Sequence, residues 1–306
     1  MSCSHNSEKY WREESKLTWK ETLTFVRDEQ QLLNPKPRWI FRGVSDNCYD
    51  LTSSLDRAFD AVKKVVKRIS LEEQWKHEIN MLYQFKRRAH HYLGADHTPR
   101  PEDFLEWFSL MRHYGAPSRM VDFSNSFYIA TYFAVSAAEK DAAVYCVNHT
   151  WLNNQVKDRL VKSDEFFQDP EVFWKYAMQH PPSLSPSDSK QREKFVVPVR
   201  PFRSNERIHV QQGLFLCPTD VNATFIENLQ AVCQNIQEAE KYILKIRIPR
   251  EWHEDVMHDL RAMNISSESL YPGMSGFAAS IKDMLYFEQP LELGRLNEAI
   301  KKHPLF

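Results

Sequence analysis

The chain has 306 residues, of which 42% are hydrophobic and 26% charged, and its formal net charge is -1. These values are typical of a globular protein with a sizeable core, and the near-neutral charge removes the usual electrostatic argument for binding nucleic acid or a membrane surface. With only seven glycines, the chain also lacks the glycine-rich cluster of a P-loop or a dinucleotide-binding turn, which argues against kinase, P-loop and Rossmann chemistry.

The cysteines and the apolar runs of the sequence indicate in which cellular compartment the protein is expected. The five cysteines are an odd number, widely scattered and without a C-x-x-C pair, so we expect idle thiols in a reducing compartment rather than disulfides or a zinc site. The opening residues, MSCSHNSEKYWREESK, are polar and carry no signal-peptide core. No run of about 18 apolar residues is present to span a membrane. We therefore predict a cytoplasmic protein without membrane segments.

The first half of the chain is expected to hold three helices and one strand. Residues 8–33 have the apolar spacing of an amphipathic helix, which two closely spaced prolines end. Residues 39–41 form a short aromatic and β-branched run that is typical of a buried strand. Further helices are predicted over 71–92 and over 104–110, the latter ending near Gly115, because glycine is suited to a helix C-terminus.

The second half mixes strands and helices without strict alternation. A short polar connection at 118–126 leads into a helix over 128–134, for which Ser124 or Ser126 is the expected N-cap. Residues 178–206 contain several prolines and are predicted to form a long loop. The remaining expected elements are strands over 142–147, 208–216 and 242–248, and helices over 225–239, 251–262 and 277–285.

This order of elements predicts an α+β fold with a mixed or antiparallel central sheet flanked by helices, since a doubly wound parallel sheet would show regular βαβ alternation. We expect three parts: an N-terminal helical extension (1–37), one α+β domain (38–290) and a C-terminal helix or tail (291–306). No internal repeat or low-complexity tract divides the chain further.

Three sequence blocks in the first half of the chain resemble the FRG domain family, which is named for its Phe-Arg-Gly signature. That signature is present here as Phe41-Arg42-Gly43. Residues 78–94, EINMLYQFKRRAHHYLG, resemble the family's E-x-x-x-L-x-x-F-x-R-x-A helix. Residues 110–135 resemble its central H-Y-G-x-P-T-R-L-L-D-W-T motif and the alanine-rich helix that follows.

Later blocks extend this resemblance. Residues 207–215 are similar to the family's R-I-x-x-Q-x-G-x-F strand, and residues 246–252 and 268–276 resemble its terminal I-P and L-F-P-D-L-D-G elements. All the blocks follow the family order and together span roughly residues 38–285. The chain departs from the family pattern at Arg112 (usually Gln), Ser118 (Thr), Phe123 (Trp), and Gly273 and Ser275 (where aspartates are usual).

The family has no settled biochemical activity, but its layout resembles the ADP-ribosyltransferase superfamily at a distance. There an arginine on the first strand meets a dinucleotide phosphate, a second strand carries a serine element, and a third supplies a glutamate. The resemblance implies that Arg42 contacts a phosphate through its planar guanidinium, with Gly43 permitting close approach. A structural interpretation stays open beside it, in which Arg42 pairs with Asp46 or Asp122.

The segment after the third helix supplies the other candidate binding residues. Asp122, Ser124 and Ser126 either present hydroxyls and helix-terminal amides to an anion, or cap the next helix and tie down the loop. Arg119 is either a second phosphate contact or a salt-bridge partner of Asp122. The sequence does not decide between these roles.

Three residues are candidates for catalysis. His113 and Tyr114 are suited to general acid/base work or to stacking, with a helix-end histidine bonded to a carbonyl as the alternative. Gln212 could recognise an amide edge, yet glutamine cannot supply the negative charge that stabilises an oxocarbenium-like centre. The nearest acids downstream, Asp220 and Glu227, lie beyond the predicted strand, and Glu268 is only a remote candidate for the role of the glutamate.

Our leading hypothesis is a protein that binds a phosphate-bearing, nucleotide-like small molecule, with NAD as the candidate substrate of an ADP-ribosyltransferase or NAD glycohydrolase. The alternative is a non-catalytic recognition or sensor module that binds a protein or nucleic-acid partner. The adjacent His90 and His91 are expected to point apart on a helix, and no H-x-x-x-H spacing occurs, so no metal is expected. Two short basic runs, 63–68 and 86–88, are assigned to solvated helix faces.

Overall fold

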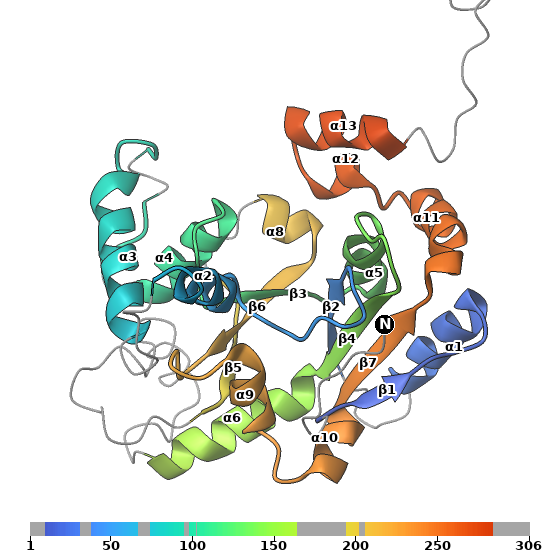
Figure 1. Cartoon of the computed structure of the whole chain (residues 1–306), viewed down its shortest axis with the longest axis horizontal. Helices are drawn as coiled ribbons and strands as arrows, with labels where there is room; N and C mark the ends of the chain where they lie inside the picture. The colour runs from blue at the N-terminus through green and yellow to red at the C-terminus, as the bar shows by residue number, and fades with distance from the viewer. Residues whose placement is uncertain are drawn as a thin grey trace, which may run out of the picture.

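The structure is a computed structural model that describes residues 10–30, 38–66, 74–94, 98–101, 103–163, 194–201 and 206–283. Within these residues seven strands form one sheet: β1 (Arg12–Glu14), β2 (Trp39–Val44), β3 (Val121–Ser124), β4 (Ala142–Asn148), β5 (Val196–Val199), β6 (Gly213–Pro218) and β7 (Ile243–Ile248). Their order across the sheet is β1-β7-β4-β2-β3-β6-β5 (Figure 1). Only the β1–β7 pair is parallel, so the sheet is mixed.

Helices cover both faces of the sheet. On one face α1 (Trp19–Glu29), α5 (Phe127–Val135) and α11 (His253–Ala262) pack on alternate residues of β2, β4 and β7. On the other face lie α3 (Gln74–Ala89), α4 (Phe104–His113), α6 (His149–Ser163) and α9 (Phe225–Gln230). Every residue of the central strand β4 is buried, which explains its continuous apolar sequence.

Smaller helices complete the described chain. They are α2 (Ser54–Lys63), α8 (Glu206–Val210), α10 (Ile236–Tyr242), α12 (Ser267–Leu270) and α13 (Met274–Ser280), with the 3-10 turns η6 (Arg250–Trp252) and η7 (Ile281–Asp283). Figure 1 shows α12 and α13 at the top of the view, near α8 and α5. Contacts between α12 and α8 hold these late segments against the strands.

The predicted α+β class is confirmed by this sheet and its flanking helices. Strands β2, β4 and β7 and helices α3, α4, α5 and α11 lie where the sequence predicted them. Helix α4 ends beside Gly115, whose φ of 77° is the left-handed geometry that makes glycine favourable after a helix. Of the two expected caps, Ser126 is the N-cap of α5.

The helix predicted over 8–33 is wrong for its first part. Residues 12–14 form β1, which pairs in parallel with β7, and α1 begins only at Trp19. Thr18 accepts a hydrogen bond from the backbone N–H of Glu21, and the Glu21 carboxylate accepts one from the backbone N–H of Thr18. This reciprocal cap sets the start of the helix. A strand of three residues is too short to give a periodic sequence signal. Its partner β7 is also distant in sequence, so no local pattern indicates the pairing.

The centre of the sheet also differs from expectation. The segment 118–126, predicted to be a connection, contains β3, which pairs along its whole length with β6. The strand predicted over 208–216 begins only at Gly213, because α8 precedes it and Gln212 adopts a positive φ of 49°. Gln211 and Gln212 therefore lie in a turn and do not alternate between the faces of a strand.

Two longer predictions are corrected as well. Instead of one helix over 225–239, α9 and α10 form separately, with Thr224 and Asn235 as their N-caps. Within the loop predicted over 178–206, β5 forms an edge strand, where Pro198 is tolerated because edge strands need fewer ladder donors. Most of that loop and the segment 291–306 lie outside the described residues, and the boundaries at 37 and 290 stay predictions.

Cysteine chemistry departs from the sequence expectation at one position. Cys48 is disulfide-bonded, so the prediction of idle thiols is wrong there, whereas the buried Cys146 and Cys217 are free thiols. Burial raises the pKa of Cys217 to about 12, which keeps this core thiol protonated. Among the helices of the described ranges, none is both long and apolar enough to cross a bilayer.

Candidate functional site

The sheet opens between β2 and β3. Six residues of β2 pair with β4 and four residues of β3 pair with β6, but β2 and β3 pair only at Phe41 and Ser124. The side chain of Arg42 spans this opening, and its Nη1 donates a hydrogen bond to the backbone oxygen of Asp122 at 2.8 Å. The guanidinium thus replaces a ladder hydrogen bond that the diverging strands do not form.

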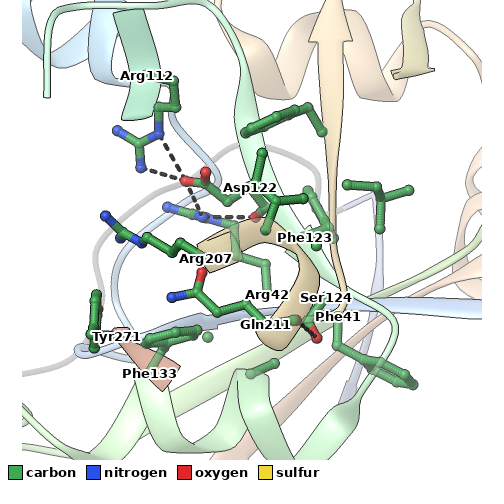
Figure 2. A pocket seen from close by; sticks show the side chains of 16 residues that line it. Phe41, Arg42, Arg112, Asp122, Phe123, Ser124, Phe133, Arg207, Gln211 and Tyr271 are labelled. Carbon is green, nitrogen blue, oxygen red and sulfur yellow. Dashed lines mark hydrogen bonds and ion pairs between the residues drawn. The ribbon is translucent and has the colours of Figure 1, made fainter. Parts of the chain in front are cut away.

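A cavity of about 260 Å³ lies at this opening, and we call it the arginine pocket (Figure 2). Strands β2, β3 and β6 contribute to its wall, together with residues of α4, α5 and α8 and one residue beyond α12. Segments that are distant in sequence therefore meet here. The lining residues are Phe41, Arg42, Gly43, Arg112, Asp122, Phe123, Ser124, Ala130, Phe133, Arg207, Ile208, Gln211, Gly213, Leu214, Phe215 and Tyr271.

Three arginines and one carboxylate dominate the polar part of the pocket. Arg112 donates from Nε and Nη2 to Oδ2 of Asp122 at 2.8 and 2.5 Å, and Nη1 of Arg42 lies 3.5 Å from the same oxygen. Arg207 forms no ion pair with the described part of the chain, and its guanidinium carbon lies 4.7 Å from the ring centre of Tyr271. The lining therefore carries two positive charges in excess.

The pKa values reflect this crowding of charge. Burial by itself would raise the pKa of Asp122, but the charges of Arg112 and Arg42 outweigh burial and hold that pKa below its usual range. Burial lowers the pKa of Arg42 to about 10; the charge of Asp122 opposes this shift, whereas that of Arg112 adds to it. Both groups are ionised near neutral pH, and the Asp122 side chain remains 44% exposed in the lining of the cavity.

Aromatic rings form another part of the wall. The ring centres of Phe133 and Tyr271 are 6.1 Å apart, and the rings meet at 77°. Nε2 of Gln211 donates to the backbone oxygen of Leu270 at 2.9 Å, which ties the turn after α8 to α12 and so helps to place Tyr271. A flat apolar surface beside guanidinium groups suits a ligand that combines a planar ring with a negative charge.

Of the predicted site residues, the structure brings Arg42, Gly43, Asp122 and Ser124 together in the arginine pocket. The pairing of Arg42 with Asp122 that the sequence left open is present. Ser124 uses its hydroxyl within the protein: Oγ donates to the backbone oxygen of Gln211 at 2.8 Å and accepts from the N–H of Ser126 at 3.0 Å. Ser124 thus joins β3 to the turn before β6.

Gly43 has a packing role in addition to its place in the lining. A Cβ atom at this position would lie 2.0 Å from the backbone oxygen of Ala130 and 2.6 Å from the backbone nitrogen of Ala134. Since side chains alternate along a strand, this contact is on the face of β2 opposite to Arg42. The glycine of the signature therefore lets α5 approach β2 closely.

Arg119 does not line the arginine pocket. Its side chain is 1% exposed, and its Nε and Nη2 donate to the carboxylate of Glu78, which is equally buried. Nη1 donates to the backbone oxygens of Pro218 and Thr219 at 3.2 and 3.3 Å. The ion pair predicted with Asp122 forms with Glu78 instead, and the burial of the guanidinium is incompatible with the predicted phosphate contact.

His113 and Tyr114 also lie outside the lining of the arginine pocket. Their rings contact each other edge to face with centres 4.8 Å apart. Burial, and next the charge of Arg207, lower the pKa of His113, so its imidazole is neutral near pH 7. Tyr114 lines a separate cavity between α3 and α4. The catalytic roles of both residues stay predictions.

Gln212 and Ser126 line a third cavity, of about 420 Å³, between α1 and the start of α5. The backbone oxygen of Gln212 accepts hydrogen bonds from the N–H and the Nδ2 of Asn125 at 3.0 and 2.7 Å. Oγ of Ser126 accepts from the N–H of Ile129 at 3.3 Å. In this structure the polar groups of this segment hold the turn before α5 in place.

The capping role of Ser126 leads to a direct prediction. Ser126→Ala is expected to lower the free energy of unfolding by about 1 kcal/mol, because the N–H of Ile129 loses its acceptor. Urea denaturation measures this change. Ser136→Ala, at the other end of α5, is the matched control, since that hydroxyl caps no N–H there, and it is expected to change stability by less than about 0.5 kcal/mol. Equal losses in the two variants would contradict the capping role.

Among the lining residues that sequence reasoning did not identify, five supply the charged, amide or aromatic side chains used in the argument below. These are Arg112, Phe133, Arg207, Gln211 and Tyr271. All of them fall within sequence blocks that resemble the family, so membership of those blocks was an available signal. The sequence predicted a strand over 208–216, whereas residues 206–212 form a helix and a turn. The directions of the Arg207 and Gln211 side chains could therefore not be predicted from strand alternation.

Part of the chain that forms the pocket matches a known protein family. The family model of the FRG domain matches residues 37–143, a segment that contains β2, α3, α4, β3 and α5. The matched segment supplies Arg42, Arg112 and Asp122, whereas Arg207 and Tyr271 lie beyond it. Searches of curated proteins and of solved structures give no match. Among the described residues, no group of three or more His, Cys, Asp or Glu side chains is placed to hold a metal ion.

Proposed function

The chain contains an FRG domain at residues 37–143, and from this premise we propose that its arginine pocket binds a phosphate-bearing, nucleotide-like ligand. The observation that carries the proposal is the excess of two positive charges in one concave site. Guanidinium groups form strong paired hydrogen bonds with phosphate oxygens, and such bonds are favoured where water is partly excluded.

The three arginines would contribute differently. Arg42 already donates to the backbone of β3, so its main role is to hold the strands and to add charge. Arg207 forms no ion pair within the described chain and is the guanidinium most available to an anion. Arg112 is engaged with Asp122 and would share its donors between this carboxylate and the ligand.

The aromatic wall and the size of the cavity narrow the ligand class. Phe133 and Tyr271 offer a surface for a planar base, and the amide of Gln211 offers a polar group beside it. The volume of about 260 Å³ is below the range of about 300–1,000 Å³ that is common for small-molecule sites. The pocket therefore suits a mononucleotide-sized ligand or one half of a dinucleotide such as NAD.

Cleavage of NAD, or transfer of its ADP-ribose, is a narrower form of the same proposal. Such chemistry is helped by a carboxylate beside the developing oxocarbenium centre. Asp122 is the carboxylate among the described lining residues, and its charge is already compensated by Arg112 and Arg42. Asp220, Glu227 and Glu268 do not contribute to the lining. The geometry therefore supports binding more directly than catalysis.

Calorimetric titration at low ionic strength tests the proposal with inorganic phosphate, AMP, ADP and NAD. We expect at least one nucleotide to bind more tightly than phosphate. Arg112→Gln and Arg207→Gln should each weaken nucleotide binding about tenfold or more, because a hydrogen bond to a charged group contributes about 1.5–3 kcal/mol. Asp122→Asn should strengthen anion binding several-fold, since it removes the competing carboxylate.

The matched control is Arg100→Gln. Arg100 is 64% exposed in its side chain, pairs with Asp103 and does not line the arginine pocket, so binding should be unchanged. If no anion binds, or if Arg112→Gln and Arg207→Gln bind as well as the unaltered protein, the pocket is not an anion site and the recognition-module alternative gains support. Release of nicotinamide from NAD, followed by mass spectrometry, separates catalysis from binding.

A further inference from the structure

A second cavity, of about 590 Å³, lies between α3 and the end of α4, and we call it the α3–α4 groove. It shares no lining residue with the arginine pocket. Its accessible surface is mainly apolar, whereas the arginine pocket is rich in charge. The groove contains Tyr114 of the H-Y-G motif, which the proposed anion site does not use.

One side of the groove is lined by residues of helix α3. Met81, Phe85 and Ala89 follow one another at intervals of four residues, and Leu93 continues the row just beyond the helix. Residues four apart lie along one face of a helix, so this row runs roughly parallel to the axis of α3. From Met81 to Ala89 it extends about 12 Å at 1.5 Å per residue. An elongated apolar channel along a helix is suited to receive another helix.

Large aromatic side chains at the groove are left open to solvent. Tyr92 is 87% exposed and Tyr114 61% exposed, although both contribute to an apolar concave surface. Met81 and Met111 add apolar side chains to the same lining. Tyrosine, methionine and arginine are enriched at the centres of protein interfaces, so this composition favours a protein partner.

Among the described residues that line the groove or lie in the last turn of α3, the charged side chains are all basic. The last turn of α3 carries Lys86, Arg87 and Arg88, and Arg88 lines the groove itself. The described lining contains no carboxylate. Glu78, the acidic residue of α3, is buried and neutralised by Arg119, so it does not offset this charge. A docking segment with acidic side chains would therefore be attracted to the rim.

We infer that the α3–α4 groove docks an amphipathic, acidic helix of a protein partner. Apolar residues spaced three and four apart on that helix enter the groove between Met81, Phe85 and Met111. Acidic residues on its flank face Arg88 and the basic end of α3. Tyr92 and Tyr114 close over its sides. From sequence, the basic run 86–88 was assigned to a solvated helix face. In this proposal the same run attracts the acidic residues of the partner helix.

Selection from a displayed library of short helical peptides tests this inference with the full chain as the target. Enriched peptides should carry apolar residues at helical spacing and an excess of Asp and Glu. Their dissociation constants, measured by fluorescence anisotropy, should rise at least tenfold for Arg88→Glu, which turns the attraction for acidic side chains into repulsion, and for Tyr92→Ala, which removes a large aromatic contact. Binding should also weaken as salt is added.

Matched controls keep the outcome decisive. Arg27→Glu changes an exposed arginine on α1, and Tyr49→Ala changes an exposed tyrosine away from the groove; both should leave peptide binding unchanged. Unchanged melting temperatures show that each variant folds. The inference is overturned if no peptide is enriched, if enriched peptides are basic, or if they bind Arg88→Glu and Tyr92→Ala as tightly as the unaltered chain. Displacement of the peptides by palmitate at stoichiometric amounts would likewise overturn it in favour of a lipid-like ligand.

Discussion

Arg119→Met is expected to lower the free energy of unfolding by about 3–5 kcal/mol, because it leaves the buried carboxylate of Glu78 without its cation. Both side chains are 1% exposed, so water cannot take over the lost interaction. The backbone oxygens of Pro218 and Thr219 lose a donor in the same variant. Urea denaturation followed by circular dichroism measures the change.

Two further variants separate this buried pair from ordinary surface charge. Combining Arg119→Met with Glu78→Met removes both charges and should recover more than half of the lost stability, since an apolar pair is tolerated where a single buried charge is not. Arg27→Met removes an arginine whose ion pair with Asp28 is exposed on both sides, and it should cost less than about 1 kcal/mol. A loss below about 1 kcal/mol for Arg119→Met would contradict a structural role for this residue.

Gly43→Ala is the second substitution with a large expected effect, about 3 kcal/mol or more of lost stability. The new Cβ would lie 2.0 Å from the backbone oxygen of Ala130, and a backbone atom of α5 cannot move aside as a flexible side chain can. Helix α5 and β2 would have to separate, which would also disturb the wall of the arginine pocket at Ala130 and Phe133. Thermal and urea unfolding should both report the loss.

Gly94→Ala is the matched control for this prediction. No described atom lies within 4 Å of the Cβ that this substitution would add, and Gly94 does not adopt a positive φ. Its stability should change by less than about 1 kcal/mol, and a small gain is allowed because alanine restricts the unfolded chain. If Gly43→Ala were as stable as Gly94→Ala, the close approach of α5 to β2 would not be required by the fold.

These two predictions assign structural roles to residues that sequence resemblance had marked for a ligand. Arg119 and Gly43 both belong to motifs of the FRG domain, yet one lies in the core and the other packs against α5. A motif thus combines residues that build the fold with residues that line its pocket. Arg42 does both, since it bridges β2 and β3 and adds charge to the cavity.

The sequence predicted those helices and strands whose own residues show a clear hydrophobic or capping pattern. The aromatic run at 39–41 and the continuous apolar run of β4 predicted buried strands, because strands covered on both faces need no polar alternation. The helical spacing of α3 and the glycine after α4 predicted that helix and the end of the next one. The convergence of Arg42 with Asp122 and Ser124 was expected from their motifs, and it is present.

The remaining features depend on partners that are distant in sequence. Val121-Asp122-Phe123-Ser124 is too short and too polar to indicate a strand, and it becomes β3 because β6 supplies its hydrogen bonds. Arg119 finds Glu78 only when α3 packs beside this segment, and Arg207 and Tyr271 reach the pocket only when α8 and α12 fold over the opening. Hydrophobic periodicity and helix capping act within a few residues, so the sequence by itself determined most of the helices and strands that form. Strand pairing and packing between distant segments decided where the sheet opens and which charged side chains meet in the arginine pocket.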